Sequence, residues 1–150
     1  MKKLLVLILM MILNSCTGYE AAFSQKKVNF YIEEIKSVKN DKISNKIVKK
    51  LKPHTLKTNK NKIKLKIDSS SEERIISKDA RGNPKVFELN VMVNIIIYQA
   101  NKQKKLSYTE SFSYGNQSNK FELNQYKKDV VTNLTNNIFE KLILDLKLNL

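Results

Sequence analysis

The amino-acid sequence predicts an α+β two-layer sandwich, in which two helices pack on one face of a four-stranded, mostly antiparallel or mixed sheet. Four segments alternate apolar and polar residues, and two segments repeat apolar residues at helical spacing. The elements follow the order strand, helix, strand, strand, strand, helix. Neither helix can bury its apolar stripe alone, so both are expected on the apolar face of the sheet. The chain has 150 residues, 41% of them hydrophobic, which suffices for one domain with a buried core.

The first strand and the first helix are expected within residues 28–56. Val28, Phe30 and Ile32 alternate with their neighbours, which predicts a half-buried strand that extends to about residue 35. Asp41 is a suitable N-cap for the helix, and Pro53 ends it, so an irregular turn is expected up to residue 56. The apolar residues of this helix share one face: Ile43, Ile47, Val48 and Leu51.

Three further strands are expected between residues 62 and 114. The second strand has one apolar and one cationic face, with Ile63, Leu65 and Ile67 alternating with Lys62, Lys64, Lys66 and Asp68. The stretches 69–73 and 80–84 are rich in turn-forming residues and are expected to be loops. The strictest alternation runs from Phe87 to Ile97 and predicts the third strand. A short polar connection at 101–105 leads to a fourth alternating segment at 106–114, which predicts an antiparallel hairpin.

The C-terminal segment is expected to form a long amphipathic helix. Asn119, followed three residues later by Glu122, resembles a capping box. From there an apolar residue recurs every four positions, which predicts a helix of about twenty-five residues. The stripe comprises Tyr126, Val130, Leu134, Ile138, Leu142 and Leu146, widened by Val131, Phe139 and Ile143.

The N-terminus has the pattern of a secretory signal peptide: a basic start, an apolar run and a small residue before a cleavage point. The apolar run extends from Leu4 to Leu13. It is shorter than the roughly 20 apolar residues that a membrane-spanning helix needs. An uncleaved anchor or a buried N-terminal helix is the alternative. The expected organisation is a signal peptide at 1–15, a tether at 16–27 and a folded domain at 28–150.

The sequence Leu13-Asn14-Ser15-Cys16 resembles a bacterial lipobox, with an aliphatic residue three positions before the cysteine and a small residue immediately before it. The resemblance implies cleavage before Cys16 and lipidation of its thiol with a diacylglycerol. The new amine would accept a further acyl chain such as palmitate, and two or more chains give stable membrane attachment. A free thiol in a flexible N-terminal stretch is the alternative. Thr17 in place of Asp is compatible with sorting to the periplasmic side of the outer membrane, as in enterobacterial lipoproteins.

The charge balance does not predict a nucleic-acid-binding protein. The chain has 28 basic and 14 acidic residues, but only Arg74 and Arg81 are arginines. The guanidinium group of arginine forms paired hydrogen bonds to phosphates and bases, which the ammonium group of lysine does not. A joint excess of Lys, Asn and Ile is what codon bias in an AT-rich genome produces. The net charge still predicts attraction of the folded domain to anionic surfaces or ligands.

No catalytic or metal-binding constellation stands out. The single cysteine, Cys16, and the single histidine, His54, exclude the usual zinc clusters, which need four ligands. Neighbouring carboxylates such as Glu33 and Glu34 would point to opposite faces of a strand, so they would not form an acid–base pair. The three glycines lie too far apart for a glycine-rich phosphate loop. The expected protein is therefore not an enzyme and has no cofactor.

The features together resemble the LptE family of outer-membrane lipoproteins, which works in lipopolysaccharide assembly. The likeness rests on the lipobox with Cys16-Thr17-Gly18-Tyr19, the long strand from Val86 to Tyr98, and Ser111-Phe112-Ser113-Tyr114-Gly115-Asn116 before the last helix. The family has a Cys-Gly-aromatic start and a Ser-Tyr-Asn turn at these places. In this chain one residue is inserted after the cysteine, and Gly115 interrupts the turn.

The resemblance implies a non-enzymatic role. The domain would sit inside the barrel of LptD as plug and assembly partner, and would help lipopolysaccharide reach the cell surface. Two lysine clusters would then face the barrel wall or lipopolysaccharide phosphates, although a solvated face is the alternative for each. The candidate binding residues are Lys62, Lys64 and Lys66 on the second strand and Lys102, Lys104 and Lys105 at the hairpin tip.

A function of another class remains open from the sequence. A periplasmic lipoprotein of inhibitor or adaptor type would bind a soluble protein or peptide through an exposed edge of the sheet.

Overall fold

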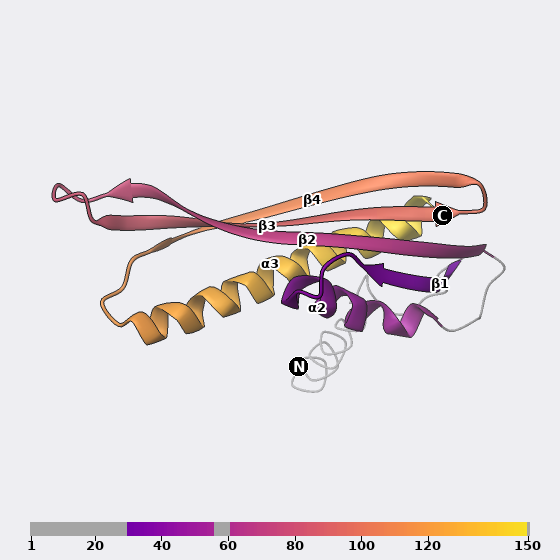
Figure 1. The fold of residues 1–150 in the computed structure, drawn as a ribbon, viewed down its shortest axis with the longest axis horizontal. Coiled ribbons are helices and arrows are strands. Elements are labelled where there is room, and N and C mark those ends of the chain that lie inside the picture. The colour runs from indigo at the N-terminus through magenta and orange to yellow at the C-terminus, as the bar shows by residue number, and fades with distance from the viewer. Residues whose placement is uncertain (1–29, 56–60, 150) are drawn as a thin grey trace, which may run out of the picture.

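The structure confirms the predicted α+β sandwich: a four-stranded mixed sheet forms one layer and two helices form the other (Figure 1). The computed structural model describes residues 30–55 and 61–149. Its elements are β1 (Phe30–Ser37), α2 (Lys42–Leu51), the short 3-10 helix η1 (Lys52–Thr55), β2 (Asn61–Lys78), β3 (Pro84–Gln99), β4 (Lys102–Gly115) and α3 (Lys120–Asn149). The expected signal peptide, the lipobox with Cys16 and the tether lie outside the described residues.

The strands lie in the order β1-β2-β3-β4. The chain passes through α2 between β1 and β2, and these two strands pair in parallel, with Phe30 opposite Asn61. The pairings of β2 with β3 and of β3 with β4 are antiparallel. A register shift between Ile32 and Glu34 places Glu33 at a bulge in β1.

The apolar core lies between the sheet and the two helices. Asp41 caps α2 as predicted, because its carboxylate accepts hydrogen bonds from the backbone amides of Ile43 and Ser44, both at 2.9 Å. The long helix α3 runs beneath the sheet, while the shorter α2 lies beside it under β1 and the first half of β2 (Figure 1). The core receives the predicted inward residues of the strands and α2, among them Ile32, Ile47, Leu51, Ile63, Leu65, Ile67, Val91, Val93 and Ile95.

The serine-rich run at 69–73 is a strand, so the prediction of a loop there was wrong. β2 continues without interruption from Asn61 to Lys78, and the run pairs residue by residue with β3, from Ser69 opposite Val93 to Glu73 opposite Leu89. The run has few of the residues that favour strands, and only Ser69 is buried, but β3 provides backbone hydrogen-bond partners along the whole run. Pairing with a strong neighbouring strand therefore overrides the local preference.

The connection between β3 and β4 is also shorter than predicted. Only Ala100 and Asn101 separate the two strands, and Gln99 pairs with Lys102. Ala100 has a φ of 50°, in the left-handed region that a tight hairpin turn requires. The segment 102–105, expected as a loop, therefore forms the first part of β4.

Helix α3 begins as predicted and is somewhat longer than expected, at 30 residues. The Asn119 side chain accepts hydrogen bonds from the amides of Phe121 and Glu122. Five of the six residues at the four-residue spacing are buried, whereas Tyr126 remains 39% exposed at the sheet end nearest the helix start. Polar contacts join α3 to the strands: the Tyr108 hydroxyl donates to Asp145 at 2.6 Å, and Lys141 pairs with Glu110. Within the described part of the chain, no helix is both long and apolar enough to span a bilayer.

Candidate functional site

The face of the sheet opposite the helices carries most of the predicted basic residues. On β2 the side chains alternate, so Ile63, Leu65 and Ile67 are buried against the helices while the intervening lysines point to the other face. We call this face, which no helix of the described structure covers, the outer face. It carries Lys62, Lys64, Lys66 and Lys105, whereas the remaining two candidates, Lys102 and Lys104, lie on the helix side.

Two of the β2 lysines are partly neutralised by the bulge in β1. The ammonium group of Lys62 lies 3.6 Å from the Glu33 carboxylate, and that of Lys64 lies 3.6 Å from Glu33 and 3.9 Å from Glu34. Lys36 joins the same group at 3.1 Å from Glu34. These pairs are largely solvent-exposed, so each stabilises the fold by about 0–1 kcal/mol at most. The beginning of β2 is therefore a mixed-charge surface.

Lys66 and Lys105 lie on the outer face on either side of one residue of β3. Ile96 pairs with Lys66 on one side and with Lys105 on the other, so the three side chains form a row across three strands. No ion pair involves Lys66 or Lys105 among residues 30–55 and 61–149. This row is the least neutralised basic feature of the outer face.

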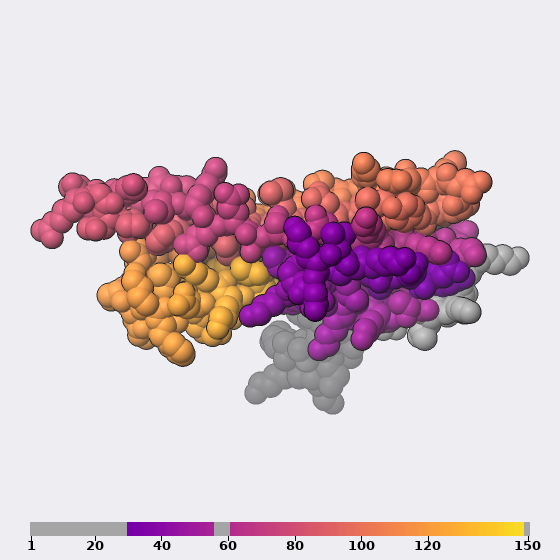
Figure 2. Space-filling model, in the orientation of Figure 1, coloured from indigo at the N-terminus to yellow at the C-terminus, as the bar shows by residue number. Residues whose placement is uncertain are grey.

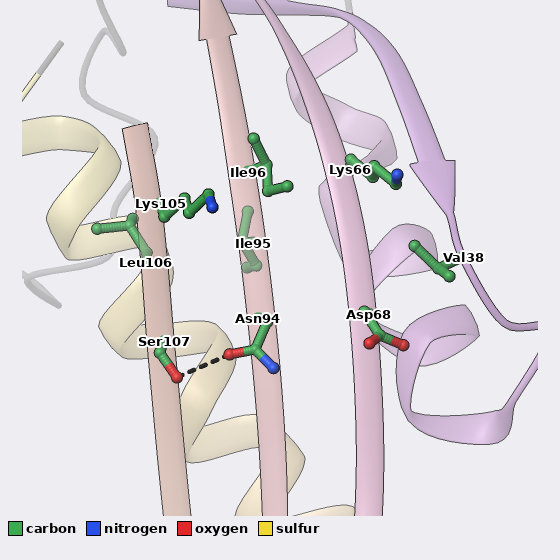
Figure 3. Close-up of a pocket in the computed structure, with 9 residues that line it drawn as sticks. All are labelled: Val38, Lys66, Asp68, Asn94, Ile95, Ile96, Lys105, Leu106 and Ser107. Atoms are coloured by element: carbon green, nitrogen blue, oxygen red, sulfur yellow. Dashed lines mark hydrogen bonds between the residues drawn. The ribbon is translucent and has the colours of Figure 1, made fainter. Parts of the chain in front are cut away.

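A shallow depression of about 490 Å³ lies along this row (Figure 3). Lys105 points from β4 toward Ile96 on β3, whereas Lys66 points away from Ile96 toward β1. Below the row, Ser107 donates a hydrogen bond to Asn94 at 2.8 Å, and Asp68 lies 3.3 Å from the ammonium group of Lys39. Ile96 thus lies between two lysines for which the described residues provide no ion pair, and this combination suits an anionic group attached to an apolar body.

Lys102 and Lys104 point to the opposite face of the hairpin. Lys104 stands opposite Ile97, whose side chain is buried on the helix side, and Lys102 follows two residues earlier on the same face. The six lysines are thus near one end of the sheet but do not form one cluster. Residues 102–105 belong to β4, so their side chains alternate between the two faces and separate Lys105 from Lys102 and Lys104. A loop, as expected from the sequence, would not have separated them in this way.

The rest of the outer face is polar and mostly neutral. Successive rows across β2, β3 and β4 bring together Asp68, Asn94 and Ser107; Ser70, Met92 and Thr109; and Glu72, Asn90 and Ser111. Ser111 donates to Asn90 at 2.6 Å, and the Arg74 guanidinium pairs with Glu88 at 2.6 Å. The outer face therefore changes along its length from lysine-rich to hydroxyl- and amide-rich.

Sequence reasoning missed a second feature, a groove of about 640 Å³ on the helix side of β2. It lies between the start of α2, the middle of α3 and the serine run of β2. At one end a buried hydrogen-bond network joins Asp41, Ser44 and Ser69: Ser69 donates to Asp41 at 2.7 Å, and the two serine hydroxyls are 2.7 Å apart. The run of three serines is the sequence feature that indicates this groove, because small side chains leave space under the strand; the prediction of a loop there did not take it into account.

The network holds Asp41 in its ionised form. Burial alone would raise the pKa of this carboxyl, but the hydrogen bonds from the Ser44 amide and the Ser69 hydroxyl outweigh burial and hold the pKa below its ordinary value. The groove therefore has a fixed negative charge at the N-terminus of α2, where the helix dipole also favours it.

His54 lies in η1, away from the groove, and is half-buried. Its ring lies 6.3 Å from the ring of Phe30, and its pKa is lowered by burial and by the nearby charge of Lys147. Among the described residues, no group of three His, Cys, Asp or Glu side chains is placed to hold a metal ion.

No protein-family model matches the chain, and no curated protein sequence resembles it. Solved structures of bacterial lipoproteins do share its fold. The rare lipoprotein B from Shewanella oneidensis superposes with a TM-score of 0.58 at 13% identity, over 75% of this chain and 93% of that one. A lipoprotein B from Nitrosomonas europaea gives 0.53 at 12% identity, over 87% and 90% of the two chains. A minor lipoprotein from Acinetobacter baumannii gives 0.56 at 11% identity, over 81% and 94%. At such identities the likeness establishes a common fold.

Proposed function

We propose that the chain is an outer-membrane lipoprotein, acylated at Cys16 and held on the periplasmic side, that acts as plug and assembly partner of an LptD-like β-barrel in the transport of lipopolysaccharide to the cell surface. Two features support the lipoprotein part. The chain has the fold of several bacterial lipoproteins, and its only cysteine stands in a lipobox-like sequence. The resemblance to the LptE family supports the assignment to a barrel partner.

The observation that carries the proposal is the outer face of the sheet. It is free of helices in the described structure, and its rows across β2, β3 and β4 consist mainly of serine, threonine, asparagine and charged side chains, with Met92 and Ile96 among them. The interior wall of a large outer-membrane barrel is itself polar. A mainly polar face of this kind can pack against such a wall with few apolar side chains between them, and its hydroxyl and amide groups find partners there.

The lysines divide into two proposed roles. Lys62 and Lys64, already paired with Glu33 and Glu34, face the barrel wall, where mixed charges fit polar side chains. Lys66 and Lys105, on either side of Ile96, contact phosphates of lipopolysaccharide, with the isoleucine against its apolar part. Lys102 and Lys104 on the opposite face contact the wall. Contacts of exposed ammonium groups with phosphates are individually modest and sensitive to salt.

Depletion of the protein in its own cells tests the function. The expected result is a fall in lipopolysaccharide at the cell surface, and its accumulation inside, restored by the wild-type chain but not by Cys16→Ser. Surface lipopolysaccharide that stays at its normal level after depletion would contradict the proposal.

A pair of matched variants tests the phosphate contacts. Lys66→Gln with Lys105→Gln removes two charges from the outer face, whereas Lys102→Gln with Lys104→Gln removes two from the helix side. We expect the first pair to weaken binding of purified lipopolysaccharide about tenfold, from roughly 0.5–1 kcal/mol per contact, and the second to leave it within about twofold. Equal effects of the two pairs would exclude a specific role for the row at Ile96.

A further inference from the structure

The second half of β2 has a free backbone edge. β1 pairs with β2 only as far as Ile67, and the chain then leaves the sheet at Val38, whose amide donates to the Ile67 carbonyl at 2.8 Å. From Asp68 to Ile75, β2 is paired with β3 alone. In an antiparallel ladder every second residue directs its N–H and C=O away from the partner strand. These eight residues therefore present an unpaired edge about 26 Å long.

The groove described above lies directly under this edge. Where β1 accompanies β2, the inward residues of β2 are isoleucine and leucine. Along the free edge they are Ser69, Ser71 and Glu73, followed by Ile75 at its far end. The small serine side chains leave space between β2 and the helices. In Figure 2, to one side of β1 and α2, α3 lies exposed below β2 and β3, where neither β1 nor α2 covers it.

The groove has an apolar floor and a basic rim. Ile43, Leu89 and Val131 contribute the apolar surface. Its charged residues are Asp41, Lys42, Lys46, Glu73, Lys127 and Lys128. Both acids are engaged within the protein, Asp41 by the capping network and Glu73 by Lys127 at 2.7 Å. Lys42, Lys46 and Lys128 have no acidic partner in the described part of the chain.

We propose that this edge accepts an extended segment of a partner protein as an additional strand, in line with β1, and that the side chains of this segment that face the groove, at every second position, include both apolar and acidic residues. Its backbone would complete the ladder of β2 from Asp68 to Ile75, and its inward side chains would fill the groove. The three lysines select acidic side chains over basic ones, although the ammonium group of Lys46 also donates to the Thr132 carbonyl at 3.3 Å. Ile75, which is 46% exposed on the helix side at the far end of the edge, is covered by the same strand.

This proposal does not depend on the assignment of a barrel as partner. It concerns one edge and one groove on the helix side of the sheet, whereas the proposed function rests on the outer face. Depletion of the protein tests only the proposed function, and the experiment below tests only the edge.

The test uses a displayed library of random peptides, panned against the unlipidated mature chain, which begins at residue 16 with Cys16→Ser. We expect enriched peptides in which every second residue is apolar, Asp or Glu, so that both kinds face the groove, with no proline. Amide hydrogen exchange with the best synthetic peptide should slow about tenfold or more at alternate residues between Asp68 and Ile75, because the added strand pairs with those amides. Failure to enrich any peptide, or protection confined to other strands, would overturn the proposal.

Matched charge variants locate the binding site. Lys42→Glu with Lys128→Glu reverses two exposed lysines of the groove and should weaken the peptide about tenfold or more. Lys49→Glu with Lys85→Glu makes the same change in net charge at exposed lysines outside the groove and should leave the affinity within about twofold. Equal losses for both pairs would overturn the proposal. So would slowed exchange along the edge in the absence of peptide that increases with protein concentration, because the occupant would then be a second copy of the chain.

Discussion

The two halves of β2 share one backbone and one partner strand, yet they differ in everything that covers them. From Asn61 to Ile67 the strand lies between β1 and β3, and its inward side chains are buried isoleucine and leucine. From Asp68 to Ile75 it pairs only with β3, and its inward side chains are mainly serine and glutamate over a groove. One neighbouring strand therefore suffices to keep this chain extended, whereas a second neighbouring strand and apolar side chains are needed to make it part of the core.

Replacing one inward residue in each half distinguishes the two halves by their free energies of unfolding. Ile67→Ala removes a fully buried side chain from the closed half and should lower the free energy of unfolding by about 2–5 kcal/mol. Ser71→Ala, in the open half, should change it by less than about 0.5 kcal/mol. Urea unfolding of the mature chain measures both. Similar losses in the two variants would show that the halves are equally part of the core.

Asp41 stands at the boundary between the halves, where it caps α2 and binds Ser69. Asp41→Ala removes the cap and should cost about 0.5–2 kcal/mol of stability. Asp41→Asn keeps a capping oxygen but removes the charge, so it is the matched control. Since the pKa of Asp41 is lowered in the folded protein, its charge stabilises the fold above about pH 4, the value of an unfolded aspartate, and this stability is lost as the pH falls through the folded-state pKa.

Stability measured against pH for the wild type and Asp41→Asn therefore checks the sign. The advantage of the wild type should be constant near neutral pH and should shrink below about pH 4. An advantage that grows on acidification would contradict the described network.

Lys127 joins the open half of β2 to α3. Its ammonium group lies 2.7 Å from Glu73 and 5.3 Å from the centre of the Phe87 ring, and the two charged side chains are only 26% and 28% exposed. Lys127→Met keeps the length of the side chain and should lower stability by about 1 kcal/mol, mainly through the lost ion pair and ring contact. Thermal unfolding of this variant beside Lys128→Met, an exposed neighbour, measures the difference. Equal melting temperatures would show that the bridge does not hold the open half.

The smallest effect is expected on the surface of the closed half. Lys62→Gln breaks an ion pair whose lysine side chain is 62% exposed, so stability should change by less than about 0.5 kcal/mol. The change should be undetectable in high salt, because salt screens exposed charges. A loss above 1 kcal/mol would mean that the lysine–glutamate group at the bulge in β1 is a structural element rather than a surface feature.

The difference between the halves also explains what the sequence could predict. Alternation of strongly apolar residues identified the closed half, the long β3 and the buried stripe of α3, because burial on one face leaves a period in the sequence. Asp41 and Asn119 identified the helix starts, because capping is a local interaction. The run from Ser69 to Glu73 carries no such period. It is a strand because of β3, which is distant in the sequence, so no local pattern could indicate it.

The candidate site was predictable to a similar extent. The residues Lys62, Lys64 and Lys66 were correctly expected on one face of a strand, because that follows from alternation alone. The positions of Lys66 and Lys105 on either side of Ile96 depend on the registers of two strand pairings, and no pattern in the sequence indicates these registers. The groove was missed for the same reason, because it lies where three elements come together and each contributes only small or ordinary residues.

Affinity purification of the mature chain from detergent-solubilised membranes tests the lipid anchor and the barrel partner together, with mass spectrometry of the retained proteins and of the N-terminal peptide. We expect an outer-membrane β-barrel in nearly equal amount and a diacylglycerol on Cys16. A chain that is recovered alone, with an unmodified thiol, would contradict this expectation.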